Sequence, residues 1–251
     1  RSVTIESDVV APAINFTTGT PDNNSFQDNA DIFVNVSSTD VGRGDGNVST
    51  FIDFDSSLVG WWRMDDVNTT EEGALVQDYL GVNNGTAVGN AVQTASGKLG
   101  KGFDFDGDGD YVDLGQPASL NFTGRMNMSV VAWIKSNKLE AFDGILSNDV
   151  GGGDTTARFG LQHWDSRLRL SVGNGTIEDN YYSAASSITA TDTWYFIAVS
   201  LNTSSAVFYI DGVMSGGVNS RTRDLASSTS NWVIGRVYNA DSLNWNGTID
   251  D

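Results

Sequence analysis

The chain consists of many short stretches in which apolar and polar residues alternate, separated by turn residues. Val, Ile, Phe, Tyr and Trp dominate these stretches, and no segment keeps a 3.6-residue apolar period for ten residues. Beyond residue 57 the pattern predicts strands at 59–64, 102–105, 111–114, 128–135, 157–162, 167–172, 194–200, 206–210 and 232–236. Many short strands without intervening helices predict an all-β sandwich or barrel.

Residues 1–57 differ from the rest of the chain. Alternation predicts strands at 13–17 and 32–36 and a third at 50–54, with a Thr-Pro-Asp-Asn turn cluster after the first. Three strands in fewer than 60 residues make a marginal sandwich on their own. Residues 1–57 resemble a short immunoglobulin-like repeat, so we expect a small β segment there and a larger β domain at 58–251.

Composition and charge narrow the class of protein. The formal net charge of −18 argues against nucleic-acid binding, and no run of about 20 apolar residues predicts a membrane span in this chain. The acidic residues are 27 Asp against 5 Glu. Asp is both a turn residue and a compact oxygen ligand, so the excess fits a loop-rich fold that holds Ca²⁺, or loop chemistry alone.

Asn-x-Ser/Thr acceptors for N-glycosylation are unusually frequent. Such acceptors are modified only on a secretory or surface route, although Asn-Gly-Thr and Asn-Thr-Ser turns also explain some of them. The chain contains no Cys, and therefore no disulfide. Together these features favour an extracellular glycoprotein, most simply an archaeal surface protein. The eleven acceptors are Asn15, Asn23, Asn35, Asn47, Asn68, Asn84, Asn121, Asn127, Asn174, Asn202 and Asn246.

Several ordered blocks of residues resemble the LamG-like jelly-roll family. They are Leu-Val-Gly-Trp-Trp-Arg-Met-Asp-Asp from residue 58, the Gly-Lys-Gly-Phe-Asp-Phe-Asp-Gly-Asp-Gly-Asp-Tyr-Val-Asp-Leu run ending at 114, and the strand at 129–135. The pair at 193–199 and 207–212 and the last six residues complete the set. The resemblance implies a concanavalin A-like jelly-roll sandwich of two antiparallel sheets, as in archaeal and bacterial surface proteins. In the family the last strand continues beyond the final Asp pair, so we expect an open sheet edge here.

The densest acidic cluster runs from Asp104 to Asp113. Alternate Asp residues of an extended segment point to one side, but the twelfth position is Gly115, so the cluster is not an EF-hand. The alternative is a tight turn at Asp108. Similarity to the family implies a structural Ca²⁺ where the early strands meet the last one. Carried onto this chain, that site comprises Asp65, Asp66, Gly107, Asp108, Asp110, Asp250 and Asp251.

Aromatic side chains near loops are candidates for stacking on sugar rings. These candidate ligand-binding residues are Trp164, Tyr181, Tyr182 and Trp245, for each of which packing in the core is the alternative. The single His163 excludes a site built from several histidines. None of the five Glu forms the Glu-x-Asp-x-x-Glu pattern of laminarinase-like sandwiches, so we expect a protein that is not an enzyme.

Two functions remain open at this point. One is a calcium-stabilised surface adhesion or recognition module that binds glycans or surface proteins. The other is a glycosylated structural subunit of an archaeal surface layer or extracellular filament, self-assembling with identical subunits by strand exchange.

Overall fold

The computed structural model describes residues 13–17, 36–39, 57–65, 67, 72–124, 127–139, 143–148, 158–237 and 243–251. The chain divides into two compact units, Arg1–Leu58 and Val59–Asp251. In the first unit, β1 (Ala13–Phe16) pairs antiparallel with β2 (Val36–Thr39). Of the predicted strand at 32–36, only Val36, the first residue of β2, lies within the described residues. The predicted strand at 50–54 lies outside them.

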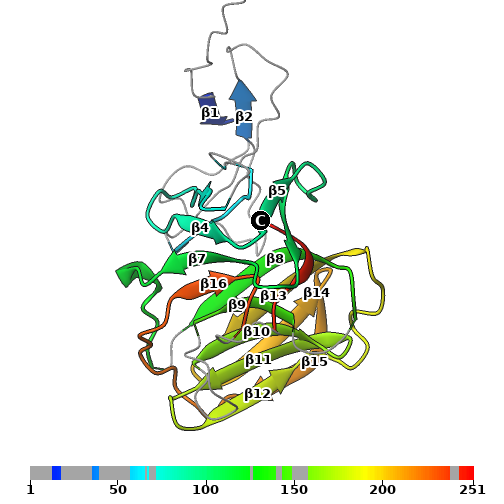
Figure 1. Cartoon of the computed structure of the whole chain (residues 1–251). Helices are drawn as coiled ribbons and strands as arrows, with labels where there is room; N and C mark the ends of the chain where they lie inside the picture. The colour runs from blue at the N-terminus through cyan, green and yellow to red at the C-terminus, as the bar shows by residue number, and fades with distance from the viewer. Residues whose placement is uncertain are drawn as a thin grey trace, which may run out of the picture. The chain divides into compact units, whose positions relative to one another are not determined.

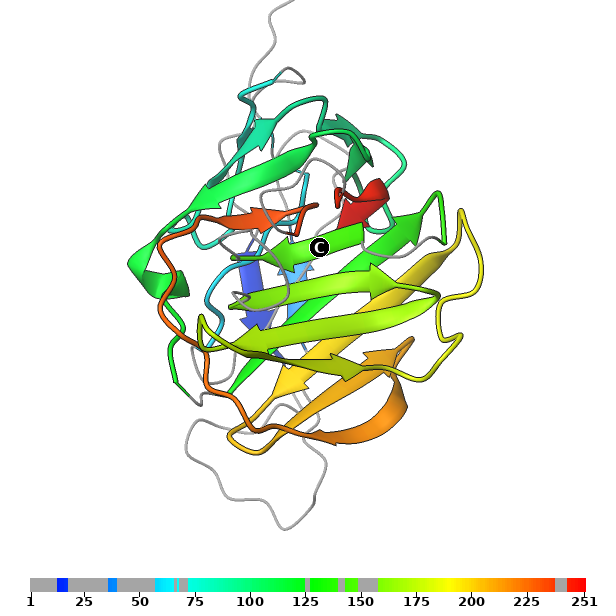
Figure 2. The ribbon, with the colours of Figure 1, turned by 60° about the horizontal axis from the view of Figure 1, so that its bottom comes forward.

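The second unit contains two antiparallel sheets, one of eight and one of seven strands, seen in Figures 1 and 2. The larger has the order β12-β11-β10-β9-β16-β7-β4-β3. Its strands are β3 (Leu75–Val76), β4 (Gly85–Val88), β7 (Tyr111–Gly115), β9 (Asp143–Ser147), β10 (Phe159–Trp164), β11 (Arg167–Gly173), β12 (Glu178–Tyr182) and β16 (Trp232–Ile234). A single 3₁₀ turn, Ala118–Leu120, is the only helical element among the described residues, so no described helix is long enough to cross a membrane.

The smaller sheet has the order β15-β14-β13-β8-β17-β6-β5. Its strands are β5 (Val92–Thr94), β6 (Gly102–Asp106), β8 (Met128–Ser136), β13 (Trp194–Leu201), β14 (Ser205–Ile210), β15 (Val213–Ser220) and β17 (Asn246–Asp250). The predicted turn at Asn202 joins β13 to β14 as a hairpin. The structure confirms the all-β jelly-roll sandwich that the sequence predicts.

The core lies between the facing sides of the two sheets. Phe103 and Ile134 of the smaller sheet and Phe159 and Leu170 of the larger are all at most 1% exposed. The intervening positions point away from the core because successive side chains of a strand alternate. Trp232 packs against the Phe159 ring at 5.3 Å and donates its indole N–H to Leu120 O at 2.8 Å, which satisfies its only polar atom.

One sequence expectation was wrong. Residues 59–64 form no strand, because this segment is held by side chains instead: Trp61 donates its backbone N–H to Asp78 Oδ1 at 2.8 Å, and Asn83 Nδ2 donates to Val59 O at 2.8 Å. β17 lies inside the smaller sheet, where it pairs with β6 on one side and with Trp133–Ser136 of β8 on the other. Within the described residues, Met128–Ala132 of β8 have no strand partner on the β17 side, so the expectation of an open edge there stays a prediction.

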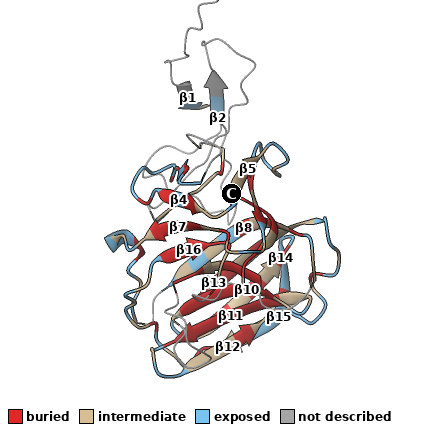
Figure 3. Cartoon of the chain, in the orientation of Figure 1, coloured by how far each residue is buried: buried red, intermediate tan, exposed pale blue. Residues whose placement is uncertain are grey.

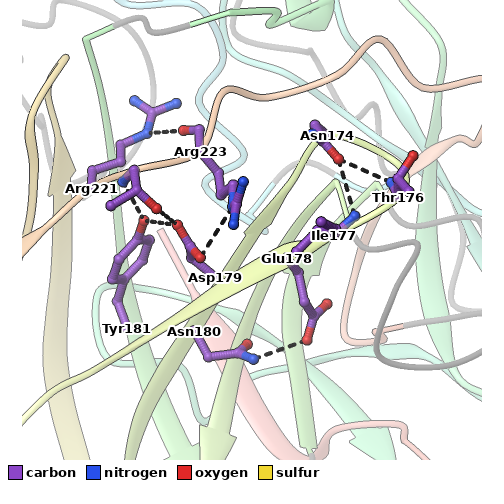
Figure 4. A network of polar contacts seen from close by, with 10 residues as sticks. Asn174, Thr176, Ile177, Glu178, Asp179, Asn180, Tyr181, Arg221 and Arg223 are labelled. Carbon is purple, nitrogen blue, oxygen red and sulfur yellow. Dashed lines mark hydrogen bonds and ion pairs between the residues drawn. The ribbon is translucent and has the colours of Figure 1, made fainter.

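The edges of the two sheets are tied together where β12 approaches β15. Asp179 Oδ2 accepts a hydrogen bond from the Tyr181 hydroxyl at 3.2 Å and another from Thr222, while its Oδ1 lies 3.4 Å from Arg223 Nε (Figure 4). Arg221, only 4% exposed, donates to the backbone oxygens of Asn202, Gly124 and Arg223. This network fixes the position of β12, which carries part of the site described next.

Candidate functional site

The side of the larger sheet that faces away from the core gathers polar and aromatic side chains on β10, β11 and β12. We call these residues the outer face: Gln162, Trp164, Arg167, Arg169, Ser171, Glu178, Asn180 and Tyr182. Cross-strand pairing places Gln162 opposite Arg169, and Arg169 opposite Tyr182. Their sequence neighbours point into the core, so the two-residue period of the strands separates a polar side from an apolar side.

Arginines lie over the aromatic rings of this sheet. The Arg169 guanidinium carbon is 4.2 Å from the centre of the Trp164 ring, and that of Arg167 is 4.3 Å from Tyr182. Both rings are half-buried. Such stacking orients flat side chains while leaving guanidinium N–H groups able to donate sideways.

A hydrogen-bonded network joins the centre of the outer face. Arg169 donates to Asn180 Oδ1 at 2.8 Å and to Glu178 Oε1 at 2.9 Å, and Ser171 donates to the same Asn180 oxygen at 2.7 Å. Figure 4 shows Glu178 and Asn180 on the side of β12 opposite Asp179. Gln162 lies beside this network with 0% exposure, and neither of its amide atoms has a hydrogen-bond partner in the structure.

Successive side chains of a strand point to opposite sides of its sheet. Because successive residues of β10 and β11 are buried, both sides of the larger sheet are covered at these strands (Figure 3). Part of the cover is the segment after β16. A Cβ at Gly144 would lie 2.1 Å from Val237 N, so this backbone presses directly on β9. Ser147 Oγ donates to Arg236 O at 2.9 Å, and the Arg236 guanidinium lies 3.6 Å from the centre of the Tyr111 ring.

The four predicted ligand-binding aromatics do not form one surface. Trp164 and Tyr182 lie on the outer face, as binding requires. Tyr181 points to the core side and is 5% exposed, and burial raises the pKa of its hydroxyl. Trp245 is fully buried, with its ring 6.2 Å from that of His163, so the prediction of ligand contact at Trp245 was wrong. Sequence reasoning missed Gln162, Arg167 and Arg169, although the Arg-x-Arg alternation in the predicted strand signals a polar side.

The smaller sheet carries a groove of about 400 Å³ on its own outward side. Most of its polar lining is already internally bonded. Thr248 Oγ1 donates to Asp104 Oδ1 at 2.5 Å, Asn90 Nδ2 donates to Asp106 Oδ2 at 3.2 Å, and hydrogen bonds from Asp108 N and from Asn90 lower the pKa of Asp106. The polar lining of this groove is therefore bonded internally, as is the centre of the outer face.

The predicted calcium ligands fall into two separate groups. Asp110 closes a loop: its carboxylate accepts the backbone N–H of Asn90 at 2.5 Å and of Asp106 at 2.7 Å, and burial raises its pKa. Asp106 pairs with Asn246, whereas Asp250 lies four residues further along β17. At about 3.3 Å per residue this separates the groups by roughly 13 Å, so the structure does not bring Asp108 and Asp110 together with Asp250. Gly107 and the exposed Asp108 belong to the same loop.

The second group comprises Asp65, Asp250 and Asp251. Asp250 Oδ2 accepts the backbone N–H groups of Lys98 and Leu99, while its buried Oδ1 has no hydrogen-bond partner. Burial, in the first place, raises the pKa of Asp250 to about 6, and Asp251 raises it further. Asp251 accepts from the Trp61 indole at 2.7 Å, and Asp65 pairs with Arg63.

This second group resembles a cation site only in part. Within the described ranges, no group of three or more His, Cys, Asp or Glu side chains is arranged to hold a metal ion. Asp66 lies outside the described residues. The unpaired, buried Asp250 Oδ1 is the one observation in the structure that fits a bound cation.

The glycosylation acceptors with described side chains are accessible with one exception. Asn246 is half-buried and donates to Asp106 O at 2.6 Å. Asn174 and Asn202 also stabilise turns, which is the alternative explanation for these sequences, because each Oδ1 accepts backbone N–H groups of its own loop. The exposed acceptors are Asn15, Asn84, Asn121, Asn127, Asn174 and Asn202. Asn23, Asn35, Asn47 and Asn68 lie outside the described residues.

Comparison with known proteins identifies the class to which this sandwich belongs. Residues 106–251 match the family model described as the concanavalin A-like lectin/glucanases superfamily. The chain belongs to that superfamily. Its Laminin G-type family model covers more than half of the sequence, from the end of β6 through β17. Among curated protein sequences no relative matches.

Solved structures support the same fold. Domain 4 of AbnA, an extracellular arabinanase from Geobacillus stearothermophilus solved with arabinotriose, aligns with a TM-score of 0.53 at 20% identity, over 69% of this chain and 82% of that one. The botulinum neurotoxin serotype G binding domain aligns with a TM-score of 0.52 at 12% identity, over 71% of this chain and 44% of that one. At these identities the likeness shows the fold alone.

Proposed function

We propose that this protein is an extracellular carbohydrate-binding module that holds a glycan across the outer face. The observation that carries the proposal is the combination of two half-buried rings, Trp164 and Tyr182, with the half-buried Arg167 guanidinium beside them. Aromatic rings present apolar surface to sugar rings, and a few fixed polar groups orient the ligand. The arabinotriose complex of AbnA domain 4 supports this choice of ligand class.

The described carboxylates of this side of the sheet favour binding over catalysis. Retaining glycosidases need two carboxyl groups about 5 Å apart. Glu178 and Asp113 lie on β12 and β7, which are five strand positions apart. At about 4.8 Å per strand they are separated by roughly 24 Å. In the groove of the smaller sheet, Asp106 has a lowered pKa, which is the opposite of what a general acid needs.

Glycan-array binding and calorimetry on the purified chain test the proposal. Trp164→Ala and Tyr182→Ala each weaken glycan binding at least tenfold, because each removes a ring that contacts the sugar. Trp194→Ala is the matched control: Trp194 is a half-buried tryptophan under a cation, Lys135, but on the smaller sheet. Binding that survives both outer-face substitutions, or no binding to any glycan, refutes the proposal.

We further propose that a Ca²⁺ ion binds at Asp250 and neutralises its unpaired, buried oxygen, with Asp65 and Asp251 as neighbouring ligands. Carboxylate oxygens are the donors that Ca²⁺ prefers, and a ligand that binds only the folded state stabilises it. Thermal melting with and without chelator measures the effect. The expected result is a lower Tm in chelator for the wild-type chain and no such change for Asp250→Asn. An identical Tm in both buffers contradicts a bound cation.

The exposed acceptors support an extracellular location, in which we expect them to carry N-glycans. The intact mass of the chain from its native source, measured before and after enzymatic removal of N-glycans, shows whether they are modified. A mass equal to that of the bare sequence removes this part of the proposal.

A second candidate function is a structural subunit of a surface layer or filament. The observation that favours it is the edge strand β15, where Val213 is 70% exposed and Val218 is 65% exposed. An exposed apolar edge strand is a template for pairing with another chain. In sedimentation experiments a structural subunit forms concentration-dependent polymers that Val218→Lys abolishes. Val82→Lys, at an equally exposed valine in a loop of the larger sheet, is the control. A chain that stays monomeric excludes this function.

A further inference from the structure

Several arginines gather on one side of the larger sheet. The chain carries a net charge of −18 and only ten arginines. Four of these ten arginines lie on or beside the outer face: Arg158, Arg167, Arg169 and Arg236. In a strongly acidic protein such a concentration creates a local field of opposite sign, which attracts anions to that surface.

Two of these guanidinium groups have no anionic partner among the residues that the structure describes. Arg169 is neutralised by Glu178 at 2.9 Å. By contrast, Arg167 contacts only the Tyr182 ring, and within the described part of the chain it makes no hydrogen bond or ion pair. Arg158 lies against Gly175, and its buried Nε has no hydrogen-bond partner. A half-buried cation that lacks a partner gains most from an anion supplied by a ligand.

The positions of these two arginines set the length of the ligand. Arg167 begins β11 opposite Trp164, at the end where β10 turns into β11. Arg158 lies at the other end of the same hairpin, where its carbonyl accepts the N–H of Gly173. Six residues of extended strand separate position 158 from Trp164, which is about 20 Å. A ligand that meets both cations is therefore a chain of several sugars rather than a single ring.

The described acidic groups nearby form no ion pair with Arg158 or Arg167. Glu178 is used by Arg169, and Asp113 accepts hydrogen bonds from Asn231 at 2.9 Å on the far part of the sheet. Asp165 is exposed in the turn between β10 and β11 and forms no described ion pair with Arg167.

We infer that the outer face binds an anionic polysaccharide, one that carries carboxylate or sulfate groups along its chain. This inference rests on the proposed carbohydrate-binding function and specifies its ligand. Arg167 and Arg158 hold acidic groups at the two ends, while the Trp164 and Tyr182 rings contact the sugar rings.

Matched pairs of polymers test the charge directly. Calorimetry compares polygalacturonate with the same polymer after its carboxyl groups are reduced to alcohols, and dextran sulfate with dextran. We expect binding to at least one charged polymer and at least tenfold weaker binding to its uncharged partner. Binding to the charged polymer also weakens as salt is raised. Equal binding to both members of each pair overturns the anionic ligand but leaves the proposed function standing. No binding to any glycan overturns both.

Charge-removing variants locate the site. Arg167→Gln and Arg158→Gln each weaken binding to the charged polymer by about tenfold, while Arg167→Lys keeps most of it. Lys101→Gln removes one positive charge from an exposed position near the smaller sheet and leaves the affinity unchanged. Circular dichroism and Tm verify that each variant folds. If Lys101→Gln lowers the affinity as much as Arg167→Gln does, binding follows net charge rather than this site, and the inference fails.

Discussion

His163 makes stability depend on pH in a way that a single substitution reveals. Its side chain is fully buried on the core side of β10, its ring lies 6.2 Å from that of Trp245, and neither ring nitrogen has a hydrogen-bond partner in the structure. Burial lowers the pKa of His163 from its ordinary 6.5 to about 4, against a smaller opposing effect of Asp165. The folded chain therefore keeps this imidazole neutral at pH values at which the unfolded chain protonates it.

The sign and size follow from proton linkage. Above pH 6.5 both states hold a neutral His163, and its contribution to stability is constant. As the pH falls from 6.5 towards 4, only the unfolded state binds the proton, and the free energy of unfolding falls by about 1.4 kcal/mol per pH unit. Across the window from 6.5 to about 4 the loss amounts to about 3 kcal/mol. Asp250, whose pKa is raised to about 6, acts in the opposite direction over part of this window.

The assay is urea unfolding of the wild-type chain and of His163→Leu, in one chelator-containing buffer, at pH 7.0, 5.5 and 4.5. Leucine removes the titrating group and places an apolar side chain in an apolar site, and the contribution of Asp250 is common to both chains and cancels in the difference. We expect the variant to gain relative stability as the pH falls, by about 3 kcal/mol over the window. A stability difference that stays constant with pH refutes the reasoning.

Two further predictions concern loops. Asp110→Asn replaces one of the two carboxylate oxygens that accept part-buried backbone N–H groups, and it lowers the free energy of unfolding by about 1–3 kcal/mol. Asp108→Asn, at an exposed side chain of the same loop, changes it by less than about 0.5 kcal/mol. If both substitutions lower the free energy of unfolding equally, the two backbone hydrogen bonds of Asp110 do not stabilise the loop as inferred. Gly235→Ala places a Cβ 2.6 Å from the Phe105 ring at φ +87°, whereas Gly109→Ala meets nothing within 4 Å at φ +80°. Thermal melting should therefore show a larger Tm loss for Gly235→Ala, because it adds a clash to a similar backbone strain.

Alternation predicted the strands that bury one side and expose the other. The predicted bounds 128–135, 167–172, 194–200 and 206–210 agree within one residue with β8, β11, β13 and β14. Each of these strands has apolar residues at every second position facing the core, which is the pattern that one sequence displays most clearly. The resemblance to the LamG-like family then supplied the pairing of the two sheets, which alternation does not contain.

Elements held by distant partners were not predictable from their own residues. β15 contains two consecutive glycines and few core residues, so its sequence signals a loop, and pairing with β14 makes it a strand. Residues 59–64 have strand composition, yet the Asp78 carboxylate takes the hydrogen bond that a neighbouring strand would supply. In both cases a contact distant in sequence overrides local propensity.

The candidate site divides in the same way. Trp164 was predictable as a candidate for ligand contact because it lies near the end of the predicted strand at 157–162, and Tyr182 because it is an aromatic residue outside the predicted strands. Trp245 has the same local signals, but its indole is enclosed in the core beside His163. The separation of Asp110 from Asp250 depends on the register between β6 and β17, which is set by residues more than 140 positions apart.

The insertion of β17 between β6 and β8 has a consequence for how the molecule is made. β17 comes from residues 246–250, so β6 and β8 are joined only after the chain has been synthesised past residue 245. Before that moment the growing chain holds two half-sheets with unpaired inner edges. Contacts this distant in sequence form slowly, so the smaller sheet is completed late in folding, and until then the inner edges of β6 and β8 are exposed to pairing with other chains.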